Sequence, residues 1–268
     1  MIKIQAKKSL GQNFLKSEAA LASIVACSEL SGESVVLEIG PGTGILTDKI
    51  LNTGVKVIAI EKDDRLIELL NEKFNSFISQ DKFTLVHADI MEIDVKSLMD
   101  EHGAKDFKLV ANIPYYLTGA IMRKFIDENL AESMTLLVQD EVAKRVVCRD
   151  GKESLLSLSV ESYGKAKYVK KVLAGSFVPA PNVDSAIIYI KRDDISIFKN
   201  PNEREVFFKL IHAGFAHKRK TLMHNLKINM ETNWPNIVET FETLNIDMKI
   251  RAEDVNMNSW MRIVHAII

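Results

Sequence analysis

Short apolar runs alternate with amphipathic segments over most of the chain. Runs rich in β-branched residues have the length of buried strands, and they fall at 35–40, 55–60, 83–87, 108–111 and 134–138. Segments with apolar residues at helical spacing lie before and between them, at 18–30, 43–51, 63–77, 119–128 and 140–148. Strands that alternate with helices form parallel sheets covered on both faces. The pattern therefore predicts an α/β fold with a doubly wound, mostly parallel sheet.

The pattern changes towards the C-terminus. Two further strand-like runs, at 168–173 and 185–191, are expected near the sheet edge. From residue 202 onward the apolar spacing is helical throughout, and the expected buried face of its first helix is formed by Val206, Phe207, Leu210 and Ile211. We therefore predict two domains: an α/β domain over residues 1–195 and a smaller all-α domain over 196–268.

The composition is that of an ordinary globular protein, with 47% hydrophobic and 26% charged residues. There is no apolar run long enough to span a membrane and no signal peptide, so we expect a cytoplasmic protein. The two cysteines, Cys27 and Cys148, are far apart, and neither they nor the histidines have the spacing of metal ligands. We expect no metal site.

The formal net charge of −1 gives no global signature of a nucleic-acid-binding protein. Three stretches, 1–17, 162–183 and 206–230, nevertheless contain lysine or arginine and no acidic residue. Separate basic stretches can together present a positive face to a polyanion. The alternative is three solvated surfaces with uneven charge, and charge alone does not decide between them.

A glycine loop, Gly40-Pro-Gly42-Thr-Gly44, directly follows the first predicted strand and opens a helix. Ligands of doubly wound sheets bind beyond the carboxyl ends of the strands, at such a turn. Dehydrogenases use a similar loop, but with GxGxxG spacing, whereas this chain has GxGxG. The acidic Glu38 before the loop would repel a pyrophosphate but not a sulfonium. The loop therefore favours S-adenosylmethionine over a dinucleotide.

Two acidic residues follow the next two strands. Glu61 ends the second strand, where a carboxylate can accept hydrogen bonds from both ribose hydroxyls. Asp89 follows the third strand and can accept a hydrogen bond from the amino group of the cofactor adenine. The alternatives are a solvated acid at a helix start for Glu61 and a helix N-cap for Asp89, and the second can coexist with ligand binding.

Asn112-Ile113-Pro114-Tyr115 follows the fourth strand. The N6 amine of adenine is a poor nucleophile, because its lone pair is delocalised into the ring. Two acceptors aimed at the amine hydrogens, the Asn112 side-chain oxygen and the Ile113 carbonyl, would favour a pyramidal nitrogen. Pro114 holds that carbonyl in an extended setting, and Tyr115 offers a face for base stacking. The loop then acts mainly by positioning, and needs no general base.

These motifs together resemble those of the RNA adenine N6-dimethyltransferase family, over nearly the whole chain. The segments that carry the resemblance are Lys7–Leu15, Val36–Gly44, Asn112–Tyr115, Phe177–Ser185, Arg219–Leu222 and Arg251–Glu253. The resemblance implies a Rossmann-like S-adenosylmethionine-dependent methyltransferase domain over 1–195 and a helical RNA-recognition domain over 196–268. The Lys-Ser-Leu-Gly-Gln-Asn-Phe-Leu arm and the Arg-Ala-Glu motif favour the branch that modifies small-subunit RNA over the large-subunit branch.

The resemblance also assigns residues. The cofactor candidates, including loop neighbours, are Asn13, Leu15, Gly40, Gly42, Glu61, Lys62, Asp89, Ile90 and Asn112. Tyr115 and Phe177 are implied to sandwich the target adenine, which must be flipped out of any pairing. The implied substrate is a pair of adjacent adenosines near the 3′ end of 16S rRNA, each methylated twice, in an immature 30S subunit. We expect a monomer.

RNA phosphates are expected to meet Lys218, Arg219 and Lys220, with Lys171 and Lys8 as weaker candidates. Four positions depart from the family pattern in ways that concern RNA contacts. They are Tyr116, where asparagine is common; Asn182, in place of a lysine; His217, in place of a glutamine; and Ser154-Leu-Leu-Ser157, in place of Tyr-Gly-Arg.

Two other functions stay open on sequence grounds. A ribosome-assembly factor that has lost its activity would keep the fold and the basic stretches, although the intact Asn112–Tyr115 loop argues against full loss. A nucleotide-dependent oxidoreductase would use a glycine loop for NADH instead.

Overall fold

The computed structural model describes residues 6–7, 10–230 and 234–268. Contacts divide the chain into two compact units, one spanning 1–143 and 166–192 and the other spanning 144–165 and 193–268. The predicted division after residue 195 assigns 144–165 to the first domain, whereas by contacts this segment groups with the C-terminal helices. The reason is helix α8 (Leu155–Tyr163), whose Leu158 is fully buried in the C-terminal core.

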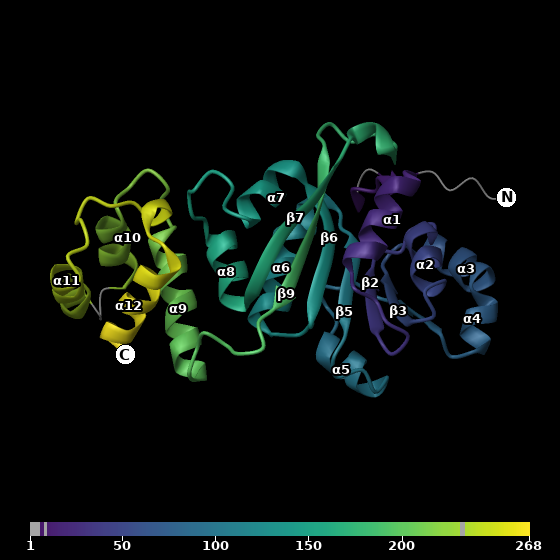
Figure 1. The fold of residues 1–268 in the computed structure, drawn as a ribbon, viewed down its shortest axis with the longest axis horizontal. Helices are drawn as coiled ribbons and strands as arrows, with labels where there is room; N and C mark the ends of the chain where they lie inside the picture. The colour runs from purple at the N-terminus through teal and green to yellow at the C-terminus, as the bar shows by residue number, and fades with distance from the viewer. Residues whose placement is uncertain (1–5, 8–9, 231–233) are drawn as a thin grey trace. The chain divides into compact units, whose positions relative to one another are not determined.

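The first unit is built on a seven-stranded sheet in the order β4-β3-β2-β5-β6-β9-β7 (Figure 1). The strands are β2 (Val35–Ile39), β3 (Lys56–Glu61), β4 (Phe83–His87), β5 (Lys108–Asn112), β6 (Ser133–Gln139), β7 (Gly164–Val172) and β9 (Ser185–Arg192). β2 to β6 pair in parallel, and β9 runs antiparallel to β6. The predicted doubly wound, mostly parallel sheet is confirmed.

Helices precede, connect and follow the parallel strands, as the apolar periodicity predicts. They are α1 (Glu18–Cys27), α2 (Ile45–Leu51), α3 (Asp64–Lys73), α4 (Asn75–Ser79), α5 (Val95–Glu101), α6 (Thr118–Asp127) and α7 (Asp140–Val146). Val36 and Val57 belong to one core with α1, α2 and α3. Their neighbours Leu37 and Ile58 point to the opposite face and are also fully buried. Helices therefore cover both faces, which explains why these strands are apolar throughout.

A second, two-stranded sheet has no counterpart in the sequence prediction. β1 (Phe14–Leu15) pairs antiparallel with β8 (Phe177–Val178), and Leu15 lies opposite Phe177. Strands of two residues are too short to show a period, so only the N-terminal motif and the Phe177–Ser185 motif pointed to these segments. The pairing brings the N-terminal arm and the Phe177–Ser185 motif together.

The described residues after 193 form helices: α9 (Pro201–Gly214), α10 (Leu222–Asn229), α11 (Trp234–Thr243) and α12 (Met257–Ile267). The predicted face of α9 is largely confirmed, because Phe207, Leu210 and Ile211 are fully buried, whereas Val206 is only partly buried. Trp260 fills the centre of this core. A Cβ on Gly214 would lie 2.5 Å from the Trp260 ring, so glycine is required there.

Within these described ranges, no helix combines the length and apolar character needed to cross a membrane.

Candidate functional site

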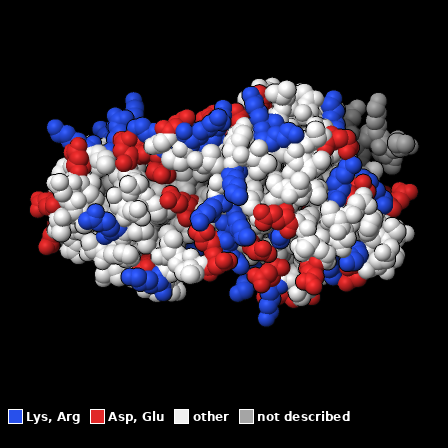
Figure 2. All heavy atoms as spheres, in the orientation of Figure 1, with Lys and Arg blue, Asp and Glu red and all other residues white. Residues whose placement is uncertain are grey.

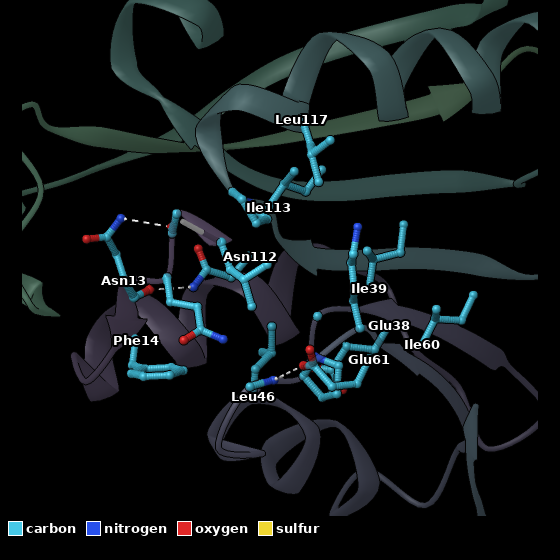
Figure 3. Close-up of a pocket in the computed structure, with 18 of the residues that line it drawn as sticks. Asn13, Phe14, Glu38, Ile39, Leu46, Ile60, Glu61, Asn112, Ile113 and Leu117 are labelled. Carbon is cyan, nitrogen blue, oxygen red and sulfur yellow. Dashed lines mark hydrogen bonds between the residues drawn. The ribbon is translucent and has the colours of Figure 1, made fainter. Parts of the chain in front are cut away.

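The carboxyl ends of β2, β3 and β5 open into a pocket with about 1090 Å³ of empty space, part of it exposed to solvent. This is the position at which ligands of doubly wound sheets bind. All of the predicted cofactor residues and the whole catalytic tetrapeptide line it: Asn13, Leu15, Gly40, Gly42, Glu61, Lys62, Asp89, Ile90, Asn112, Ile113, Pro114 and Tyr115. Segments up to 100 residues apart in sequence are thereby brought to one site (Figure 3).

The glycine loop closes the floor of the pocket between β2 and α2. Gly40, Gly42 and Gly44 all have positive φ, at 65°, 59° and 73°. A Cβ on Gly42 would lie 3.1 Å from the Phe14 ring. The Lys73 ammonium donates hydrogen bonds to the carbonyls of Thr43 and Gly44, at 3.0 and 2.8 Å. The loop is therefore held tightly, with its backbone close to any ligand in the pocket.

Glu61, at the tip of β3, is turned inward and is only 6% exposed. Its two oxygens accept hydrogen bonds from the Gly42 and Asp63 amides, at 3.1 and 2.8 Å. Burial raises the pKa of this carboxyl, and the backbone amides partly oppose the rise. Each carboxylate oxygen has a second lone pair, so the arrangement leaves acceptors for ligand hydroxyls. A solvated acid at a helix start, the alternative for Glu61, does not fit this burial.

Glu38 lies beside Glu61 and is 1% exposed (Figure 3). Its Oε2 atom has no hydrogen-bond partner among the described residues. Burial, with a smaller contribution from the neighbouring Glu61, raises the pKa of Glu38 to about 8. At neutral pH Glu38 is therefore mainly protonated. The sequence argument that Glu38 repels a pyrophosphate by its charge therefore loses its support.

Asp89 follows β4 and accepts hydrogen bonds from the Lys62 ammonium and from the Met91 amide, the latter at 2.9 Å. The Lys62 ammonium lowers the pKa of Asp89, so this residue is a carboxylate. The expected alternative was a helix N-cap. Asp89 instead caps a turn, since α5 begins only at Val95 and its N-cap is Asp94.

Asn112 ends β5, and its side-chain amide has a fixed orientation. Its Nδ2 donates a 3.2 Å hydrogen bond to the backbone carbonyl of Asn13 in the N-terminal arm. The donor end of the amide is thus engaged by the arm, and Oδ1 is left as the acceptor end (Figure 3). The contact provides an oriented acceptor at the tip of the strand, as the catalytic hypothesis requires.

The turn after Asn112 fixes the tyrosine. The Leu117 amide donates a 2.9 Å hydrogen bond to the Pro114 carbonyl, which closes the 3-10 turn η2 (Tyr115–Leu117). The Tyr115 hydroxyl lies 2.7 Å from Oγ of Ser185, which is fully buried at the start of β9. Sequence reasoning did not single out Ser185 for this role, although it is the last residue of the Phe177–Ser185 motif.

Phe177 is placed differently from the rest of the predicted set. It is 2% exposed, belongs to the core beneath the β1–β8 pair and does not line the pocket. Its predicted role, stacking on the target adenine opposite Tyr115, stays a prediction and would require this ring to move.

The N-terminal arm is tied down by a charged contact that the sequence did not reveal. Asp63, whose side chain has no exposure, accepts a 2.8 Å hydrogen bond from Nε2 of Gln12. Arg65 donates to both Asp63 oxygens, and this contact holds the pKa of Asp63 well below its usual range. The arm is therefore anchored, through Gln12, to a buried carboxylate at the N-terminus of α3.

The predicted RNA contacts fall in different surroundings. Lys218, Arg219 and Lys220 are exposed in the turn between α9 and α10, which the buried Asn225 holds by donating to the carbonyls of Gly214 and His217. Lys171 forms an ion pair with Asp184 at 2.9 Å. Lys8 lies outside the described residues.

The face drawn in Figure 2 carries positive and negative side chains interspersed, and it is not a uniform positive surface. No three histidine, cysteine, aspartate or glutamate side chains are grouped to hold a metal ion within the described segments.

Comparison with known proteins gives a consistent result. The family model described as ribosomal RNA adenine dimethylase matches residues 3–268. A protein of Dehalococcoides mccartyi named ribosomal RNA small subunit methyltransferase A is 40% identical, over 97% of this chain and 88% of its own length. One of the same name from Bacillus pumilus is 38% identical, over 97% of this chain and 91% of its own.

Solved structures agree with the fold. A dimethyladenosine transferase from Plasmodium falciparum superposes with a TM-score of 0.77 at 26% identity, over 93% of this chain and 95% of its own. The 23S rRNA methyltransferase ErmE superposes with a TM-score of 0.74 at 24% identity, over 95% of this chain and 99% of its own.

Proposed function

Because the chain belongs to the ribosomal RNA adenine dimethylase family, we propose that it is an S-adenosylmethionine-dependent 16S rRNA (adenine-N6,N6)-dimethyltransferase. Its substrate is a pair of adjacent adenosines near the 3′ end of 16S rRNA, and the modification belongs to small-subunit biogenesis. The observation that carries the proposal is the Asn112 amide, whose Nδ2 donates to the Asn13 carbonyl, so that Oδ1 is the end of the amide that can accept from a ligand.

The pocket fits S-adenosylmethionine on its chemistry. Glu61 accepts from two backbone amides and still has lone pairs for ribose hydroxyls, and Asp89 can accept from the adenine amino group. The backbone of Gly40 and Gly42 lies open to the ligand. The GxGxG spacing of the glycine loop, in place of the GxGxxG of dehydrogenases, argues against the oxidoreductase. When bound, S-adenosylmethionine supplies a methyl group on a positively charged sulfur.

The chain's own contribution to the reaction is positioning. Oδ1 of Asn112 and the carbonyl of Ile113 accept hydrogen bonds from the two amine hydrogens of adenine, and so direct the nitrogen lone pair towards the cofactor. The Tyr115 ring, tethered through Ser185, supports the base. The amine proton becomes acidic only when the nitrogen turns cationic, so water can accept it without a dedicated base.

The partner and setting are proposed from the same relatives. The proteins of Dehalococcoides mccartyi and Bacillus pumilus are named for the ribosomal small subunit, which supports 16S rRNA in an immature 30S subunit as the partner. The enzyme would act in the cytoplasm as a monomer, with the exposed Lys218–Lys220 turn against RNA phosphates. Lys171 and Lys8 remain weaker candidates for such contacts.

A methyl-transfer assay tests the proposal. Purified protein is incubated with labelled S-adenosylmethionine and small subunits from cells that lack it. Wild type should form N6,N6-dimethyladenosine, and Asn112→Ala should lose at least about a hundredfold in rate, as expected when an oriented acceptor is removed from a transition state. Asn71→Ala, an exposed asparagine on α3, serves as the matched control.

Two outcomes would contradict the proposed methyltransferase activity. Tight binding of wild type to the subunit without any methylated product would identify an assembly factor instead. Binding of NADH in place of S-adenosylmethionine would revive the oxidoreductase.

A further inference from the structure

Tyr116 is a large aromatic side chain that is left exposed at the rim of the pocket. It is 61% exposed and lines the pocket directly beside Tyr115. Of the exposed large hydrophobic side chains in the part of the chain that the structure describes, Tyr116 is the one that lines this pocket. Exposure of so much apolar area at a binding site indicates a ligand that covers it.

The two adjacent tyrosines are held in different ways. The Tyr115 hydroxyl is anchored to the buried Ser185, and burial raises the pKa of Tyr115. Tyr116 lies in the same 3-10 turn and is exposed to solvent. One ring is therefore built into the pocket, whereas its neighbour is presented outward from the pocket rim.

The outward ring has firm support behind it. A Cβ built on Gly11 would lie 3.1 Å from Cε1 of Tyr116 and 3.4 Å from Cβ of Pro114. The bare backbone of Gly11, at φ +61°, thus packs closely against the ring, at a position where an added Cβ would be crowded. The arm that carries Gly11 is itself fixed by the bond from Gln12 to Asp63. A ring supported on one side and exposed on the other is suited to stacking.

The charge at the pocket rim indicates the kind of ligand. Lys62 lines the same pocket as Tyr116, and its ammonium forms an ion pair with Asp89. The Lys62 side chain is 57% exposed. An aromatic face beside an exposed cation is the combination that binds single-stranded nucleic acid, with the base on the ring and the phosphate near the cation.

We propose that Tyr116 stacks on the nucleotide adjacent to the target adenine, and so is a positioning residue for the RNA substrate. The inference rests on the proposed function, which supplies RNA as the substrate. Tyr115 supports the adenine inside the pocket, and Tyr116 holds the next base at its rim. The hydroxyl contributes little, because the ring face carries the contact.

The test compares Tyr116→Ala, Tyr116→Phe and Tyr116→Trp. Equilibrium affinity for small subunits from cells lacking the protein is measured by sedimentation, which does not require turnover, and S-adenosylmethionine affinity is measured by calorimetry. Tyr116→Ala should weaken subunit affinity between about fivefold and about a hundredfold, as expected for one stacked base. Cofactor affinity should stay within about twofold, and Phe and Trp should restore subunit binding.

Ile195→Ala, which removes an apolar side chain that is 84% exposed and lies outside the pocket, is the matched control and should bind subunits as wild type does. Unchanged subunit affinity in Tyr116→Ala would overturn the inference. So would a loss of cofactor affinity that Tyr116→Phe restores, since the ring would then act on the cofactor. If wild type transfers no methyl group, the proposed function fails, and the binding series still decides the role of Tyr116.

Discussion

The buried side chain of Glu38 makes the stability of the protein depend on pH. It is 1% exposed, its Oε2 has no partner in the described structure, and its pKa is about 8 instead of the ordinary 4.5. The folded protein therefore binds the Glu38 proton more tightly than the unfolded chain does. The contribution of Glu38 to the free energy of unfolding is therefore largest below about pH 4.5 and is lost as the pH rises towards 8.

Glu38→Gln should remove this dependence. The free energy of unfolding of wild type should fall relative to the variant between pH 5 and 8, by up to a few kcal/mol at about 1.4 kcal/mol per pKa unit. Urea denaturation at several pH values measures this difference. Glu72→Gln, on the exposed side of α3, should follow wild type. Parallel curves for wild type and Glu38→Gln would contradict the assigned pKa.

At the residue scale, the sequence predicted the pocket well where a side chain follows a strand. Glu61, Asp89 and Asn112 end or follow strands of a parallel sheet, and the sheet itself brings their side chains together. Contacts between distant loops could not be predicted this way. Ser185 and Asp63 act through partners 70 and 51 residues away, and nothing in their local sequence marks those partners.

The N-terminal arm is the element on which the site depends most. Its Asn13 carbonyl orients Asn112, and its Gln12 is tied to Asp63. We expect Gln12→Ala to loosen the arm, because it removes a hydrogen bond to a charged, buried carboxylate, worth about 1.5–3 kcal/mol. The variant should bind S-adenosylmethionine about tenfold or more weakly and should turn over more slowly.

Calorimetry and single-turnover rates measure both effects of Gln12→Ala. Lys16→Ala, an exposed position directly after the arm, is the control. If Gln12→Ala keeps full cofactor affinity and rate, the arm is held in place without the Asp63 contact.

The basic turn between α9 and α10 is the second element that carries a prediction. Reversal of charge by Lys218→Glu with Arg219→Glu should lower RNA affinity at least about tenfold at low salt, and should reduce the steepness of the salt dependence, because fewer counterions are released. Binding to small subunits at several salt concentrations measures both. Lys96→Glu with Lys105→Glu, two exposed positions near α5, changes net charge equally and serves as the control. An unaltered salt slope would exclude phosphate contacts at this turn.

A short strand was predicted more accurately than the longest helix. β4, predicted over 83–87, has the same bounds in the structure, because turn residues flank its run. The predicted helix over 63–77 is instead broken at Phe74 into α3 and α4. Phe74 faces inward against Gly44, where a Cβ would lie 2.6 Å from its ring. Tertiary packing of one side chain thus overrides a continuous helical pattern.

At the scale of the whole molecule, the fold class followed from the alternation of strands and helices, because every connection in a parallel sheet must cross over. Which segments belong to each compact unit could not be predicted from this alternation. Segment 144–165 groups with the C-terminal helices although it lies between strands of the sheet in sequence. Local periodicity describes how a helix is buried, but not which core buries it.

The most direct test is mass mapping of 16S rRNA from cells that lack this protein and are supplied with wild type or Asn112→Ala at equal levels. Wild type should give two adjacent N6,N6-dimethyladenosines near the 3′ end, and Asn112→Ala should leave both adenosines unmodified. Full modification by Asn112→Ala, or in cells without the protein, would contradict the claim that this asparagine positions the amine that receives the methyl group.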